Sequence, residues 1–118
     1  MRRSIILLVL LLAGCGASDE QRIRDTIDRY GEAIADGNPA KVCDELIGPD
    51  GPCEEQFTEQ ILLLSDKERA ALRSLRVADV RIVGKVAEVT LKQDLDVIPD
   101  KMRLRKDGRK WSIDPKSV

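Results

Sequence analysis

Apolar residues recur every three or four positions in the first half of the chain and every second position in the second half. Between about Asp19 and Asp36 this period predicts an amphipathic helix. Its apolar stripe consists of Ile23, Ile27, Tyr30 and Ile34. The remaining positions of the segment are mostly charged, so we expect the helix to pack on another element through one face.

Turn and cap residues predict three further helices. Gly37 suits a left-handed helix end, Asn38 an N-cap and Pro39 a first helical position, so a second helix should run from Pro39 to about Ile47 with Cys43 on its buried side. After a Gly- and Pro-rich turn, a third helix opens at Cys53 with an inner stripe of Phe57, Ile61 and Leu64. The capping box Ser65-Asp66-Lys67-Glu68 predicts a short helix through Leu72.

The alternating pattern predicts four strands. The first, Leu75 to Val83, changes phase at Asp79, which indicates a bulge, and Gly84-Lys85 forms a turn to the second strand, Val86 to Gln93. Met102 and Leu104 alternate with basic residues in the third strand. Asp107-Gly108 is typical of a hairpin turn, and we expect Trp111 and Ile113 on the buried face of the fourth strand. The chain is therefore predicted to be α+β, with helices before an antiparallel sheet.

The first fifteen residues have a basic start, a short apolar run and small residues before Cys15, which is typical of a secretory signal. Leu12-Ala13-Gly14-Cys15 resembles the bacterial lipobox, whose cysteine receives a diacylglyceryl group before cleavage. The resemblance implies a signal peptide at residues 1–14 and a lipidated tether at 15–19. The remaining residues, 20–118, are enough for one compact domain and too few for two. The protein would sit on the extracytoplasmic face of a cell membrane; the alternative is an ordinary signal with an incidental cysteine.

With Cys15 lipidated, Cys43 and Cys53 remain, and an oxidising compartment allows them to pair. Two alternatives are a metal site and a redox pair. The chain has no histidine to complete a metal site, and redox cysteines are more often spaced Cys-x-x-Cys.

Composition excludes some classes of partner. The chain carries a net charge of −1, with acidic residues concentrated early and basic residues late. Only Tyr30, Phe57 and Trp111 are aromatic, which argues against base-stacking or sugar-stacking surfaces. We therefore expect no nucleic-acid partner and no cofactor.

Helices followed by a meander that ends in Asp107-Gly108-Arg109-Lys110-Trp111-Ser112-Ile113, with Val86-Ala87-Glu88-Val89 upstream, resemble the nuclear transport factor 2-like superfamily. That resemblance implies helices lying across a curved antiparallel sheet of about four strands, with a conical pocket between them. Small secreted bacterial lipoproteins are common in this superfamily. Fold alone confers no chemistry.

Enzymes of this superfamily use acid and base groups in the pocket. Their histidine-carboxylate dyads cannot form here, whereas an isomerase-like site needs a carboxylate base, a phenol and a protonated carboxyl group. Tyr30 and Asp79 are the candidates, although a single inward tyrosine is usually a core residue and a strand aspartate usually lies at a bulge or faces water. Asp94, Asp96 and Asp100 lack the glycine and glutamate spacing of a calcium loop, so we expect no metal.

A basic cluster is the other candidate surface: Lys101, Arg103, Arg105, Lys106, Arg109 and Lys110. On one face of a hairpin these side chains could contact anionic lipid or an acidic partner. Alternatively, they keep the outer face of the sheet soluble.

The leading hypothesis is a membrane-anchored, non-enzymatic envelope lipoprotein that binds a small apolar ligand or another envelope protein. One alternative is an isomerase- or cyclase-like enzyme that uses Tyr30 and a carboxylate. The other is a structural or inhibitory protein-interaction module.

Overall fold

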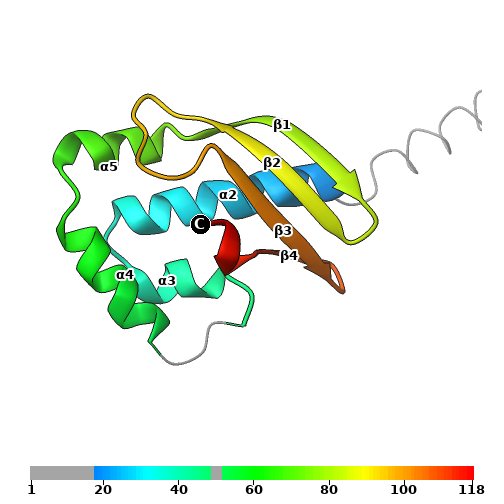
Figure 1. The fold of residues 1–118 in the computed structure, drawn as a ribbon, viewed down its shortest axis with the longest axis horizontal. Coiled ribbons are helices and arrows are strands. Elements are labelled where there is room, and N and C mark those ends of the chain that lie inside the picture. Colours follow the sequence, from blue (N-terminus) through cyan, green and yellow to red (C-terminus); the bar gives the residue numbers. More distant parts are fainter. Residues whose placement is uncertain (1–17, 49–51) are drawn as a thin grey trace, which may run out of the picture.

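A computed structural model describes residues 18–48 and 52–118, which form an α+β fold of helices packed against a four-stranded open sheet (Figure 1). The predicted signal peptide and Cys15 lie outside these residues. The elements are α2 (Asp19–Ala35), α3 (Pro39–Asp44), α4 (Cys53–Leu62), α5 (Asp66–Arg73), β1 (Arg76–Val83), β2 (Val86–Lys92), β3 (Lys101–Asp107), β4 (Lys110–Ile113) and the 3-10 helix η1 (Pro115–Ser117).

The sheet is an antiparallel meander with the strand order β1-β2-β3-β4. The register between β1 and β2 shifts between Val77 and Asp79, which confirms the predicted bulge. The β3–β4 turn falls on Gly108 and Arg109, one residue later than predicted, and Gly108 takes a positive φ of 61° there. No helix within residues 18–48 and 52–118 is long and apolar enough to cross a membrane.

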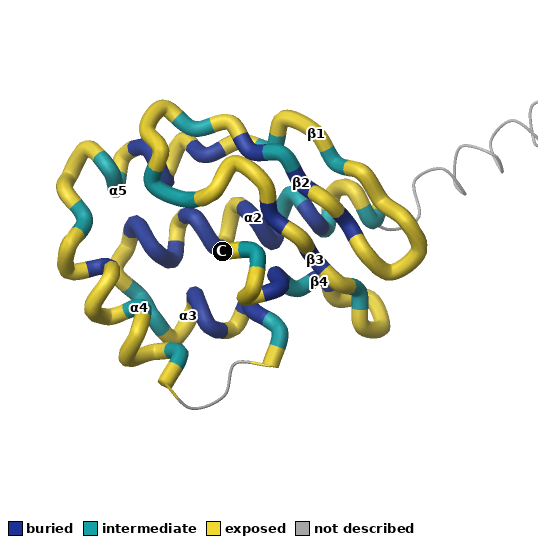
Figure 2. Tube along the Cα trace, viewed as in Figure 1, coloured by how far each residue is buried: buried dark blue, intermediate teal, exposed yellow. Residues whose placement is uncertain are grey.

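The core lies between the inner face of the sheet and α2 (Figure 2). The predicted stripe of α2 is buried, and so are the inward residues of β2, β3 and β4, including Trp111. The Trp111 indole N–H donates to Asp19 Oδ1 at 3.1 Å, and the Thr26 hydroxyl donates to the Trp111 carbonyl oxygen at 3.1 Å. These bonds join the start of α2 to the last strand, so the predicted strand phase of Trp111 is confirmed.

The caps predicted between the helices are also confirmed. Gly37 has a φ of 71°, the Asn38 side chain accepts from the Lys41 N–H, and Ser65 and Glu68 form the reciprocal capping box. Sequence reasoning did not identify the role of Gly31, where a Cβ atom would lie 2.8 Å from the Leu72 carbonyl oxygen. Glycine is therefore what permits the close approach of α2 and α5.

The second helix is shorter than predicted, because α3 ends at Asp44 rather than near Ile47. Leu46 instead forms a parallel bridge with Ile113, and the Ile47 N–H donates to the Ile113 carbonyl oxygen at 2.9 Å. Pairing with the end of β4 thus supplies the backbone hydrogen bonds that a further helical turn would have made.

Candidate ligand pocket

A pocket of about 370 Å³ opens between α4, the loop before β3 and the C-terminal segment. This volume lies within the range of small-molecule sites in proteins. Most of the lining is apolar: Tyr30, Leu46, Ile47, Gly48, Pro52, Cys53, Gln56, Phe57, Gln60, Val97, Ile98, Pro99, Pro115 and Val118.

The disulfide between Cys43 and Cys53 positions the α4 wall of this pocket. It confirms the predicted pairing, with the two Cα atoms 6.2 Å apart. Cys43 is buried in α3, and Cys53 is the first residue of α4. The bond therefore fixes the first residue of α4. This matters because α4 has little buried surface of its own, with Ile61 as its one buried residue.

Arg69 of α5 and an aromatic pair hold the rest of α4. The Arg69 guanidinium donates to the Ile61 carbonyl oxygen at 3.0 Å and to the Ala35 carbonyl oxygen at 3.3 Å, so it ties the ends of α4 and α2 together. Phe57 packs edge-to-face on Tyr30, with the ring centroids 6.5 Å apart. The two rings thereby form one continuous part of the pocket lining.

Gln93 builds the opposite wall, a role that sequence reasoning did not identify. Its side-chain oxygen accepts from the N–H groups of Val97 and Ile98 at 3.0 and 3.2 Å, and its amide group donates to the Ile98 carbonyl oxygen at 2.6 Å. A glutamine directly after a strand, four residues before an apolar Val-Ile-Pro run, is the signal that could have revealed it. These bonds hold Val97, Ile98 and Pro99 against the pocket.

The side chains of the described lining are uncharged. Among the described residues that line the pocket, Tyr30, Gln56 and Gln60 supply the polar side-chain groups, and none is a carboxylate or a cation. Burial raises the pKa of the Tyr30 phenol well above its ordinary value of 10.0, so the hydroxyl stays protonated at neutral pH. Such a lining suits the binding of an apolar molecule, with a few neutral hydrogen-bonding groups to orient it.

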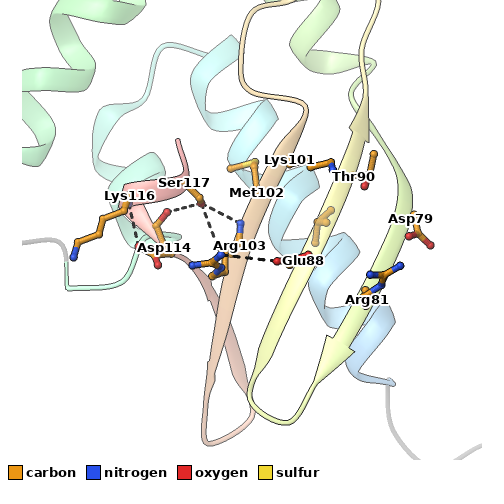
Figure 3. A pocket seen from close by; sticks show the side chains of 11 residues that line it. Asp79, Arg81, Glu88, Thr90, Lys101, Met102, Arg103, Asp114, Lys116 and Ser117 are labelled. Carbon is orange, nitrogen blue, oxygen red and sulfur yellow. Dashed lines mark hydrogen bonds and ion pairs between the residues drawn. The ribbon is translucent and has the colours of Figure 1, made fainter.

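The structure does not bring the two predicted catalytic candidates together. Tyr30 lines the pocket beside α4, whereas Asp79 is exposed and lines a separate hollow of about 430 Å³ that also includes outward residues of the sheet. Figure 3 shows this second hollow, where Asp79 and Arg81 lie on β1 and Arg103 approaches Glu88 from β3. The phenol and this carboxylate therefore form no acid-base pair.

The basic cluster is split between the two faces of the hairpin. Lys101, Arg103 and Arg105 are exposed on the outer face, and Arg109 lies in the β3–β4 turn. The prediction that Lys106 shares their face is wrong, because its Nζ lies 3.0 Å from Asp19 Oδ1 and 5.9 Å from the centre of the Trp111 ring. Its spacing from Leu104 already puts it on the inner face.

The outer-face cations are partly paired. Arg103 lies 3.8 Å from Glu88, and Arg105 lies 3.8 Å from Asp114. With acidic groups interspersed, this face has no uniform positive charge.

Two acidic residues in the loop before β3 accept hydrogen bonds from neighbouring side chains. Asp94 accepts from the Ser74 hydroxyl at 3.2 Å, and Asp100 accepts from the Gln93 amide at 3.2 Å. Within the described residues, no group of three or more potential ligands is placed to hold a metal ion.

Comparison with known proteins gives no relative from which a role could be transferred: no protein family, curated protein or solved structure matches this chain.

Proposed function

We propose that this chain is a lipid-anchored, non-enzymatic binding domain on the extracytoplasmic face of a cell membrane, and that it takes a small apolar ligand in the pocket beside α4. The observation that carries the proposal is the lining of that pocket. Leu46, Phe57 and Ile98 line the pocket from three separate segments of the chain. The described lining contains no charged side chain. Burial of apolar ligand surface would supply most of the affinity.

The proposed location rests on two features of the cysteines. Leu-Ala-Gly-Cys at residues 12–15 has the pattern of a lipidation site, and the Cys43–Cys53 disulfide is the kind of bond that persists in oxidising compartments. Both features are consistent with export of the chain and retention at the membrane by its N-terminal lipid.

We further propose that the α+β domain is a nuclear transport factor 2-like cone. The order of helices before a meander and the hairpin that carries Trp111 support this assignment. Superposition of an experimentally solved structure on members of that superfamily would test it, and helices that fail to superpose across the sheet would contradict it.

An envelope protein is a second candidate occupant of the same region. Leu62 and Leu63, at the end of α4, have 76% and 84% of their surface exposed. Two adjacent exposed leucines are a plausible contact for a protein partner that covers α4.

Binding of N-phenyl-1-naphthylamine, a neutral apolar fluorophore, tests the proposed ligand site. The mature chain, residues 15–118, would carry Cys15→Ser, so that it lacks both the lipid and the apolar signal segment and needs no detergent. We expect saturable enhancement of the probe's fluorescence. Gln56→Trp should abolish it, because Gln56 is exposed and lines the pocket, so the larger side chain fills the site without disturbing the core.

Thr58→Trp is the matched control, since Thr58 lies on the same helix, is exposed and does not line the pocket. It should leave probe binding unchanged. Absence of saturable binding, or equal binding by the Gln56 and Thr58 variants, would contradict the proposal.

A further inference from the structure

The β1–β2 turn exposes apolar side chains on both faces of the sheet. In this hairpin tip, which we define as residues 82–86, Val83 is 74% exposed, Ile82 39% and Val86 36%. Val83 pairs with Val86, and Ile82 pairs with Ala87 of the inner face. The inner face is thus less well covered at the tip than at Ala87 and Val89, which are buried.

Basic side chains surround this apolar tip. Lys85 lies in the turn itself, Arg105 is the cross-strand partner of Val86, and Arg109 occupies the neighbouring β3–β4 turn. Three acidic groups lie nearby. Asp114 lies 3.8 Å from Arg105, Asp107 is opposite Lys110, and Asp19 contacts Lys106 and Trp111. Lys85 and Arg109 form no ion pair with a described residue, so they remain beside an exposed apolar turn. Exposed apolar side chains flanked by basic residues are typical of a surface that enters the interface of an anionic membrane.

The start of α2 lies at the same end of the molecule as this tip (Figure 1). Asp19, the first helical residue, lies 3.0 Å from the Lys106 ammonium group, and the Lys106 backbone N–H donates to the Lys85 carbonyl oxygen at 2.8 Å. One side chain and one backbone hydrogen bond therefore connect the beginning of the fold to the turn of the hairpin tip.

The tether between Cys15 and α2 is short, so the start of α2 and the nearby hairpin tip must stay close to a lipid on Cys15. Only four residue steps separate Cys15 from Asp19, and a fully extended chain spans at most about 3.6 Å per residue, or about 14 Å in total. A lipid on Cys15 would hold this end of the fold next to the bilayer. The opposite end, with Leu62 and Leu63, would face away from it.

We propose that the hairpin tip docks into the interface of an anionic lipid bilayer, with Val83 inserted among the headgroups and Lys85 and Arg109 beside them. The proposal rests on the lipid anchor of the proposed function. It goes further by giving the domain a fixed orientation, in which α4 and the ligand pocket beside it lie away from the membrane-bound tip (Figure 1).

Site-directed spin labelling tests this orientation on the full mature chain in vesicles of phosphatidylcholine and phosphatidylglycerol. A nitroxide would be attached at Val83→Cys or, as the matched control, at Leu63→Cys, which is also exposed and apolar but lies at the other end. Acylated Cys15 and the Cys43–Cys53 disulfide would leave the introduced thiol as the one that reacts. The readout is the accessibility of the label to oxygen and to a water-soluble nickel chelate.

We expect the label at position 83 to gain access to oxygen and lose access to nickel, while the label at position 63 keeps the accessibility seen in water. Lys85→Ala should lower the ratio of inserted to free label about fivefold, because each basic residue near an anionic surface contributes about that factor. A water-exposed label at position 83 on a lipidated chain would overturn the docking proposal but leave the anchor intact.

The mass of the mature chain separates failure of the anchor from failure of the docking. A mass without the lipid would contradict the anchor and with it the reason for placing the tip at the membrane, so both proposals would fall. Protection of position 83 in native envelopes combined with full water exposure in pure lipid vesicles would assign the tip to a protein partner and overturn docking to lipid.

Discussion

Helices α2 and α4 are attached to the rest of the molecule in opposite ways. Eight of the 17 residues of α2 are buried against the sheet and the other helices, whereas α4 buries one of its ten. A disulfide, an arginine and one aromatic contact hold α4 instead. The comparison indicates that α2 and the β3–β4 hairpin form a scaffold, by which we mean the part held by buried apolar contacts. Helix α4 forms one side of the ligand pocket and is attached to the scaffold by a few specific contacts.

Truncation of Trp111 should have the largest effect, because it removes the scaffold's largest buried side chain. We expect Trp111→Ala to lower the free energy of unfolding by about 3 to 5 kcal/mol, measured by urea denaturation followed by circular dichroism. Lys101→Ala, on the exposed face of the same hairpin, should change it by no more than about 0.5 kcal/mol. Equal unfolding midpoints for the two variants would show that the buried indole does not support the scaffold.

Loss of the disulfide should have a smaller and more local effect. Reduction of Cys43–Cys53 should lower the free energy of unfolding by somewhat under about 3 kcal/mol, given the short loop that it closes. Amide hydrogen exchange should accelerate in α4 far more than in α2, because α4 has little buried surface to replace the bond. Uniform acceleration in both helices would instead show that the disulfide supports the whole fold.

Protonation of Asp19 should have the smallest effect. The hydrogen bond from the Trp111 indole and the Lys106 ammonium group lower the pKa of Asp19 below its ordinary value of 3.8. Folding therefore favours the ionised carboxylate, whose contribution is complete above that value and is lost as the pH falls through the lowered pKa.

Denaturation of the wild type and Asp19→Asn between about pH 7 and pH 2 checks this contribution. The wild type should be the more stable protein at neutral pH, and its advantage should shrink as the solution becomes acidic. A difference that stays constant across this range would show that the charge of Asp19 does not contribute.

The scaffold could be predicted from the sequence because its signals are periodic and local. The spacing of Ile23, Ile27 and Ile34 identifies the buried face of α2, and alternation alone places Trp111 inside. The same alternation assigns Lys106 to the inner face, two residues after Leu104. Treating all the cations of the hairpin as one group concealed that assignment.

The pocket could be predicted much less well, because it depends on contacts between distant segments. Helix α3 ends early because Leu46 pairs with Ile113. No residue near position 44 indicates this helix end in the sequence. The wall at Val97 depends on hydrogen bonds to the side chain of Gln93. Similarly, the sequence places Asp79 at a bulge. That Asp79 and Tyr30 line different pockets, however, can be seen only from the arrangement of the whole sheet.

The bond between Asp19 and Trp111 also has a consequence for the order in which the chain folds. The two residues are 92 positions apart, and the Thr26 bond to the same strand spans 85 positions. Contacts this distant can form only after Trp111 has been synthesised, and their loop-closure entropy slows folding. The start of α2 would therefore gain its bonds to β4 late in folding, after the local helices and hairpins have had the opportunity to form.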